Sequence, residues 1–215
     1  MSRRWEKRGA KIQTVTRHLN DEVEVLDLLP EEAEPRDHLI QFYGRDHQLL
    51  IGNVGRFFRV GLRRGEGLLA IASLEHCDAF ARELRREPAY QSAVREGRLI
   101  FLDAELVLAQ SMVEGRLALS QLESTITATI QDLKARAPAA PVRVFGEMVG
   151  LLWRASRIDE ALELEECWNG LLQRHGIILF CAYPIDRLDQ EKVDRVDAVL
   201  ASHTHVVTAR RGVDA

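Results

Sequence analysis

The feature that most constrains the fold is an alternation that runs along the chain from residue 38 onward. Short, mainly apolar runs alternate with longer stretches in which apolar residues recur at helical spacing. βα units leave this pattern, because each strand is followed by a helix that covers the sheet. Several of the runs are apolar on both faces, as buried parallel strands are. The sequence therefore predicts a three-layer α/β fold with a mainly parallel central sheet. The expected strands are HLIQFY (38–43), GLLAIAS (67–73), RLIFLD (98–103), VRVFG (142–146), IILFCAY (177–183) and HTHVVT (203–208).

Apolar residues spaced by three or four positions predict the helices between these strands. The clearest helix is expected at 158–174, where Trp168 lies on the apolar face. Ser156 is the expected N-cap of this helix, and Gly176 is its expected C-terminal stop. The other expected helices span 46–63, 76–86 and 114–136.

Composition limits the classes of protein to which the chain can belong. With 215 residues, of which 46% are hydrophobic, the chain can bury the core of one domain. A net charge of -4 and a pI near 6.0 argue against direct binding to nucleic acid. No apolar run is long enough to span a membrane, so we expect a cytoplasmic protein. The cysteines are far apart in the sequence and are expected to be reduced core thiols: Cys77, Cys167 and Cys181.

Residues 1–35 differ in composition from the rest of the chain. A basic block is followed by an acidic block, and Pro30 and Pro35 close the segment. We interpret residues 1–35 as a flexible charged leader, or as a docking segment that becomes ordered on a partner. Residues 36–215 are expected to form one α/β domain.

Removal of the leader is therefore predicted to leave the thermal unfolding transition of the domain nearly unchanged. Differential scanning calorimetry of the full chain and of a chain that starts after the leader would check this. A cooperative loss of structure in the shortened chain would show that the leader belongs to the core.

The turn after the first strand stands where many α/β proteins hold a phosphate group. A P-loop reads GxxxxGK[ST], in which glycines expose backbone N–H groups, Lys contacts the phosphates and the hydroxyl binds Mg²⁺. This chain reads FYGRDHQLL, which has one glycine, Gly44, and neither Lys nor Ser nor Thr. Asp46 adds a negative charge where phosphates would lie. The sequence therefore predicts that this turn does not bind a triphosphate.

Four blocks of sequence, in this order and spacing, resemble one family. They are HLIQFY, GLRRGEGLLAIASLEH, RVFGEMVGLLW and LELEECWNGLLQRHGIILFCAYP. Together they resemble the MEDS domain (methanogen/methylotroph, DcmR sensory domain) over roughly residues 36–208. The resemblance implies a RecA/KaiC-like fold that has lost its phosphate loop, and a role in bacterial or archaeal signalling. It also implies a small organic ligand, and a protein partner such as a histidine kinase or a transcription regulator.

Ligands of doubly wound α/β proteins bind outside the carboxyl ends of the strands, and this rule selects candidate ligand-binding residues. Tyr43, His76 and Tyr183 are expected to shape a compact pocket. Glu75 and Glu147 stand at helix starts, where we interpret them as helix caps or polar ligand contacts rather than catalytic acids. The full set of candidates, to which the resemblance adds His38, is His38, Tyr43, Glu75, His76, Cys77, Glu147 and Tyr183. A histidine at a strand start is more often structural, and that reading of His38 stays open.

Metal binding and catalysis receive less support from the sequence. His203 and His205 would share one face of a strand and could bind a metal with Cys77, His76 or Cys181, but no spacing completes such a site. No local motif of a hydrolase, metalloprotease or dinucleotide-binding protein is present. We therefore expect neither a metal, nor a cofactor, nor enzymatic activity.

The predicted function is that of a sensory domain in signal transduction, which acts through a protein partner or its own homo-oligomer. One alternative is a RecA-like enzyme with a degenerate phosphate loop, which would need Arg45, Arg63 or Arg64 in place of the missing Lys. Another is a pure protein-interaction module with a vestigial pocket.

Overall fold

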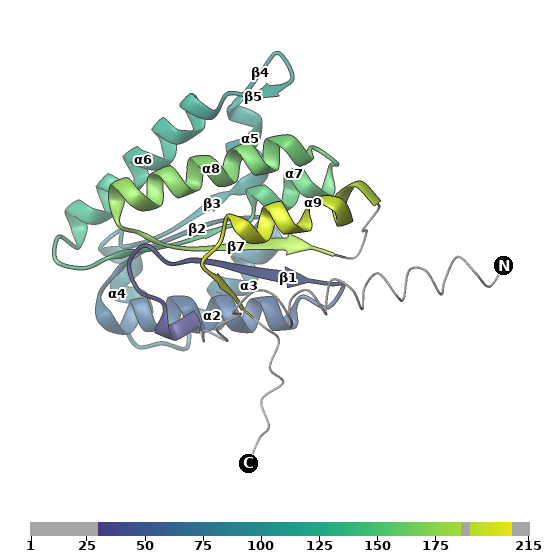
Figure 1. Ribbon diagram of the computed structural model, residues 1–215. Coiled ribbons are helices and arrows are strands. Elements are labelled where there is room, and N and C mark those ends of the chain that lie inside the picture. The colour runs from purple at the N-terminus through teal and green to yellow at the C-terminus, as the bar shows by residue number, and fades with distance from the viewer. Residues whose placement is uncertain (1–29, 186–189, 208–215) are drawn as a thin grey trace.

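A six-stranded sheet lies between two layers of helices in the computed structural model, which describes residues 30–185 and 190–207 (Figure 1). The strand order is β3-β2-β6-β7-β1-β8, and the strand pairs of this sheet are parallel. The predicted three-layer α/β fold is therefore confirmed. The strands are β1 (His38–Tyr43), β2 (Gly67–Ala72), β3 (Leu99–Asp103), β6 (Val142–Gly146), β7 (Ile178–Pro184) and β8 (His205–Val206).

The helices divide between the two faces of the sheet (Figure 1). One face is covered by α2 (Gln48–Arg64), α3 (Leu74–Leu84) and α4 (Tyr90–Arg95). The other is covered by α5 (Ala104–Gln110), α6 (Leu119–Arg136), α7 (Met148–Arg154), α8 (Ile158–His175) and α9 (Gln190–Ala201). Because successive side chains of a strand point to opposite faces, each strand contributes to both cores.

Two local predictions were wrong. Residues 114–136 are not one helix, because a small hairpin of β4 (Met112–Val113) and β5 (Arg116–Leu117) precedes α6. Its turn is formed by Glu114 and Gly115, both with positive φ, which is what a tight two-residue hairpin requires. Ser156 is not the N-cap of α8, since Arg157 occupies that position and the Ser156 hydroxyl accepts a hydrogen bond from Lys192.

Residues 30–35, assigned to the leader from the sequence, lie against the domain at the amino ends of the strands. They begin with the short 3₁₀ helix η1 (Pro30–Glu32), and Ala33 is fully buried. The buried guanidinium of Arg143 donates hydrogen bonds to the carbonyl oxygens of Pro30 and Ala33, at 3.4 and 3.3 Å. It also pairs with Glu66, with 2.5 Å between Nε and Oε2. A chain that starts after residue 35 would lose these contacts, so the truncation expected to leave the unfolding transition nearly unchanged is the removal of residues 1–29. Residues 1–29 lie outside the described residues.

None of the helices among residues 30–185 and 190–207 is long and apolar enough to cross a membrane.

Candidate functional site

Four side chains meet where the carboxyl ends of β1, β2 and β6 come together. We call Tyr43, His47, His76 and Glu147 the edge cluster. Tyr43 ends β1, His76 lies in the first turn of α3 after β2, and Glu147 follows β6 directly. Tyr43, His76 and Glu147 are buried, whereas His47 is partly exposed. Three of the residues that the strand-end rule selected as ligand-binding candidates, Tyr43, His76 and Glu147, therefore lie close together in the folded chain.

Hydrogen bonds connect the partly exposed end of the edge cluster to its buried end. Nδ1 of His47 lies 2.9 Å from Nε2 of His76, and Nδ1 of His76 lies 2.8 Å from Oε1 of Glu147. A carboxylate only accepts, so His76 carries a proton on Nδ1, and its Nε2 accepts from His47 when the ring is neutral. Tyr43 donates to the same Glu147 oxygen at 3.2 Å, and Arg154 donates to the Tyr43 hydroxyl at 3.3 Å.

Glu147 is ionised in this environment and also stabilises the start of α3. Its Oε2 accepts a hydrogen bond from the N–H of Ser73, the N-cap residue of α3, at 2.9 Å. Burial alone would raise the pKa of Glu147, but the hydrogen bond and charge of His76 and the hydrogen bonds of Ser73 outweigh burial and hold the pKa below its usual value. The interpretation of Glu147 as a cap is therefore correct for the neighbouring helix α3. At the start of its own helix, α7, its side chain makes no cap hydrogen bond.

Glu147→Gln is predicted to reduce stability at neutral pH by about 1.5–3 kcal/mol, because it weakens hydrogen bonds to a charged group. A carboxyl group whose pKa is lower in the folded state stabilises the protein above its unfolded pKa, near 4.3, and loses this effect as the pH falls through the folded value. The difference in unfolding free energy between parent and variant should therefore be present from pH 7 to 5 and shrink below about pH 4.

Chemical denaturation of both proteins across this pH range measures that difference. The exposed Glu105, in the first turn of α5, is the matched control: Glu105→Gln should cost less than about 1 kcal/mol. A Glu147→Gln cost that does not shrink below pH 4 would show that the pKa of Glu147 is not lowered in the folded state.

In the loop between β1 and α2, the carboxylate of Asp46 lies at the start of helix α2. Oδ1 of Asp46 accepts a hydrogen bond from the N–H of Gln48 at 2.9 Å, so a carboxylate already takes up an N–H group that could bind phosphate. Arg63 and Arg64 lie at the far end of α2, which has 17 residues and is about 25 Å long. Arg63 pairs there with Glu87, and Arg64 lies 3.8 Å from Glu66. Neither arginine can replace the missing lysine.

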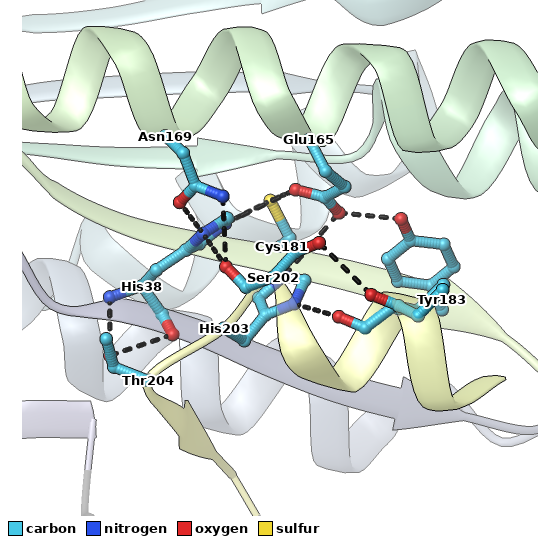
Figure 2. A network of polar contacts seen from close by, with 10 residues as sticks. His38, Glu165, Asn169, Cys181, Tyr183, Ser202, His203 and Thr204 are labelled. Carbon is cyan, nitrogen blue, oxygen red and sulfur yellow. Dashed lines mark hydrogen bonds and ion pairs between the residues drawn. The ribbon is translucent and has the colours of Figure 1, made fainter.

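A second group of polar side chains lies on the opposite face of the sheet. We call His38, Glu165, Cys181 and His203 the buried cluster (Figure 2). His38 comes from β1, Glu165 from α8, Cys181 from β7, and His203 from the segment that follows α9. Strand alternation places His38 and Cys181 on this face, together with Tyr183. The expected pocket of Tyr43, His76 and Tyr183 is therefore wrong, because Tyr183 lies on the other face.

The histidines of the buried cluster both have Nδ1 engaged by backbone carbonyl groups. Nδ1 of His38 lies 3.0 Å from the Ser202 carbonyl oxygen and 2.9 Å from Oδ1 of Asn169, and Nδ1 of His203 lies 2.6 Å from the Val199 carbonyl oxygen. Carbonyl oxygens only accept, so both rings carry a proton on Nδ1 and leave Nε2 unprotonated when neutral. Both Nε2 atoms lie within 3.5 Å of a Glu165 oxygen.

Desolvation dominates the electrostatics of this cluster. Burial raises the pKa of Glu165 to about 8, although hydrogen bonds from Tyr183 and Cys181 act in the opposite direction. Burial lowers the pKa of His38 to about 4 and that of His203 well below its usual value. It also raises the pKa of the Cys181 thiol, with the nearby Glu165 adding to the effect. The cluster therefore consists of polar groups that are held largely neutral in the interior.

The remaining predicted site residues lie outside both clusters. Glu75 is exposed in the first turn of α3. Cys77 donates to the carbonyl oxygens of Ala72 and Leu102, and burial raises the pKa of its thiol to about 11. His205 approaches Asp37 at 3.8 Å rather than sharing a site with His203.

Sequence reasoning missed Glu165 and Asn169, and the final set of candidates left out His47. A signal for Glu165 existed, because it stands on the apolar face of α8 beside Leu164 and Trp168. The role of His47 depends on contact with a residue 29 positions away, and no local pattern shows such a contact.

Three features define the class of this domain: its parallel sheet, its strand order, and the edge cluster that stands in place of a phosphate loop. They make it a RecA-like α/β domain without the P-loop. In structure the chain is similar to a solved ATPase domain, with a TM-score of 0.51 and 9% sequence identity, covering 96% of this chain and 86% of that chain. The chain matches the family model of the MEDS domain, the MEthanogen/methylotroph, DcmR Sensory domain, over residues 37–204. It therefore belongs to the MEDS family. No curated protein matches it.

Proposed function

We propose that this chain is a sensory domain that binds a compact organic ligand at the edge cluster and signals its presence to a protein partner. Membership of a family described as sensory supports the first part of this proposal. The observation that carries it is the chain of hydrogen bonds from His47 to Glu147, which lies where ligands of parallel α/β sheets bind.

The geometry favours a ligand that carries a hydroxyl or carboxylic acid group. Nε2 of His76 is an acceptor when the ring is neutral, and a ligand O–H group can take the place of the His47 donor there. The exposed guanidinium of Arg154, which bonds to Tyr43, offers donors to an acidic ligand. Displacement of His47 would then move the first turn of α2. Such a switch requires the ligand to bind the two arrangements with unequal affinity.

The proposed partner contacts the surface beside this turn. Leu49 in the first turn of α2 and Leu74 at the start of α3 are exposed, at 39% and 66%, and lie two residues from His47 and His76 respectively. A histidine kinase or transcription regulator in the cytoplasm, or a second copy of the chain, would sense the altered turn there. Leu74→Ser is then expected to weaken partner binding while it leaves ligand binding intact.

Enzymatic activity is not part of this proposal. Glu147 is occupied by hydrogen bonds from Tyr43, His76 and Ser73, and the loop that precedes α2 presents Asp46 instead of a lysine. These contacts engage the acidic group, and the loop lacks the lysine that would neutralise charge on a transferred phosphoryl group.

A thermal-shift screen tests the ligand proposal, because a ligand that binds only the native state raises its melting temperature. The panel contains small alcohols, small carboxylic acids and nucleotides. We expect a shift with a compact hydroxyl or carboxyl compound, loss of that shift in His76→Gln, and tighter binding in His47→Ala, where the competing donor is absent. His175→Gln, which alters a histidine at the far end of α8, is the matched control and should keep the shift. A shift that persists in His76→Gln would move the ligand away from the edge cluster.

A further inference from the structure

We propose that the buried cluster of His38, Glu165, Cys181 and His203 is a binding site for a zinc-like divalent metal ion. This inference goes beyond the proposed function and does not depend on it, since the buried cluster and the edge cluster lie on opposite faces of the sheet.

The donor atoms have the spacing of a tetrahedral site. Zinc lies about 2.0–2.3 Å from its nitrogen, oxygen and sulfur ligands, so the ligands of a tetrahedral site are about 3.3–3.8 Å apart. In the buried cluster, Nε2 of His38 is 3.4 Å from Sγ of Cys181 and 3.4 Å from Oε2 of Glu165. Nε2 of His203 is 3.5 Å from Oε1 of Glu165, and Sγ of Cys181 is 3.7 Å from Oε2. One donor atom from each of the four residues can be chosen so that all lie within 4.8 Å of one another.

Hydrogen bonds of the Cys181 thiol reach His38 and Glu165, but hydrogen bonding does not account for the position of His203. The two nitrogen–oxygen distances exceed the 2.7–3.2 Å of ordinary N–H···O bonds. Nε2 of His203 has no hydrogen-bond partner within the described part of the chain, and the side chain that carries it is only 1% exposed. A buried acceptor without a partner costs free energy, and a metal ion would satisfy it.

The surroundings already orient the ligands as metal sites require. Carbonyl oxygens hold the Nδ1–H groups of His38 and His203, so both Nε2 lone pairs face the cluster (Figure 2). The Asn169 amide donates to the Ser202 carbonyl and directs its oxygen toward His38. Tyr183 donates to Oε1 of Glu165 at 2.6 Å. These contacts fix the donors from outside the cluster.

Charge and ligand type indicate the class of metal. Metal binding would displace the protons of the Cys181 thiol and the Glu165 carboxyl group. The resulting thiolate and carboxylate carry two negative charges, which balance a divalent ion between two neutral imidazoles. Thiolate and imidazole favour zinc and similar transition metals over Mg²⁺ and Ca²⁺. Because four protein ligands fill a tetrahedron, the site is closed, as structural zinc sites are.

The ion would fasten the segment after α9 to the sheet. His203 precedes β8, which is two residues long and pairs with β1 through Leu39↔His205 and Ile40↔Val206. The N–H groups of the flanking Thr204 and Val207 donate to carbonyl oxygens of β1. Transient detachment of so short an edge strand offers an entry path for the metal. With the metal bound, His203 joins this segment to ligands from β1, β7 and α8.

Titration of the chelator-treated chain with Co²⁺, followed by competition with Zn²⁺, tests the site. We expect one equivalent of Co²⁺ to give the visible spectrum of a tetrahedral site with thiolate charge-transfer absorption, and Zn²⁺ to abolish it. Cys181→Ser and His203→Gln should each lower metal affinity more than about 100-fold, and Asn169→Ala, which only positions His38, by about 10- to 100-fold. Zn²⁺ should also slow hydrogen exchange in residues 202–207 of the parent.

Two control variants test whether the metal binds at the buried cluster rather than elsewhere in the molecule. Cys77→Ser replaces another buried cysteine, and His76→Gln alters the edge cluster, so both should bind the metal as the parent does. Circular dichroism identifies variants that fail to fold, and the conservative Asn169→Ala variant then carries the test. Absence of stoichiometric binding by the parent would overturn the proposal. Unchanged affinity in Cys181→Ser and His203→Gln, or loss of binding in His76→Gln, would do the same.

Discussion

Replacement of Trp168 by alanine is expected to lower the free energy of unfolding by about 3–5 kcal/mol. Trp168 is fully buried on the apolar face of α8, as the sequence predicted, and its ring packs against β6. A β-carbon at Gly146 would lie 3.4 Å from the indole ring, in van der Waals contact, so the ring lies directly against this strand. Loss of the ring would leave a cavity that the rigid sheet cannot fill.

Urea denaturation of the parent, Trp168→Ala and Trp168→Phe measures this cost. Trp168→Phe keeps an aromatic ring in place and should lose clearly less stability than the alanine variant. Leu106→Ala, at a side chain that is 54% exposed on α5, is the surface control and should change stability by no more than about 0.5 kcal/mol. A near-neutral Trp168→Ala would place the indole outside the core.

Arg143→Met is expected to cost a similar amount, about 3–5 kcal/mol, because it removes the closest partner of the buried Glu66 carboxylate and leaves the more distant Arg64, at 3.8 Å. Arg143 is fully buried on β6, and its guanidinium lies 5.0 Å from the centre of the Phe57 ring. It also holds the Pro30 and Ala33 carbonyl groups, so its loss should release residues 30–35 from the domain. Hydrogen exchange in that segment should therefore become faster.

The double variant Arg143→Met, Glu66→Leu separates the orphaned charge from lost packing. Replacement of both partners by apolar residues should recover much of the stability lost in Arg143→Met, since no unpaired charge then remains. Arg195→Met breaks an exposed pair with Asp159 and should cost no more than about 1 kcal/mol. A double variant less stable than Arg143→Met would show that the pair is not the source of the effect.

The core strands were predictable because each combines an apolar run with charged or glycine-containing flanks. The run 142–146 matches β6 residue for residue, and those of β1, β2, β3 and β7 differ by a residue at most at either end. The hairpin before α6 was not predictable from helical spacing, since it depends on the backbone conformation of Glu114 and Gly115. Helix propensity and the spacing of apolar residues predict whole segments, and they do not reveal a turn that interrupts a segment.

The sequence predicted which edge of the sheet carries the candidate site, but it did not predict on which face of the sheet each side chain lies. The strand-end rule selected Tyr43, His76 and Glu147 correctly as neighbours. It also selected Tyr183, which alternation along β7 places on the opposite face beside Glu165. The buried cluster combines residues from four separate segments, and the last of them, His203, follows α9. Only the folded chain shows that these residues meet.

We propose that the edge cluster stands where a RecA-like fold would hold its phosphate site and that it does not bind a triphosphate. Steady-state hydrolysis of ATP and GTP in the presence of Mg²⁺ tests it most directly, with the parent beside a Glu75→Gln, Glu147→Gln double variant. We predict no turnover above background in either protein, because the missing Lys and the Asp46 carboxylate deprive a triphosphate of its cationic contacts. Turnover by the parent that disappears in the double variant would contradict this account and would identify a nucleotide-hydrolysing enzyme.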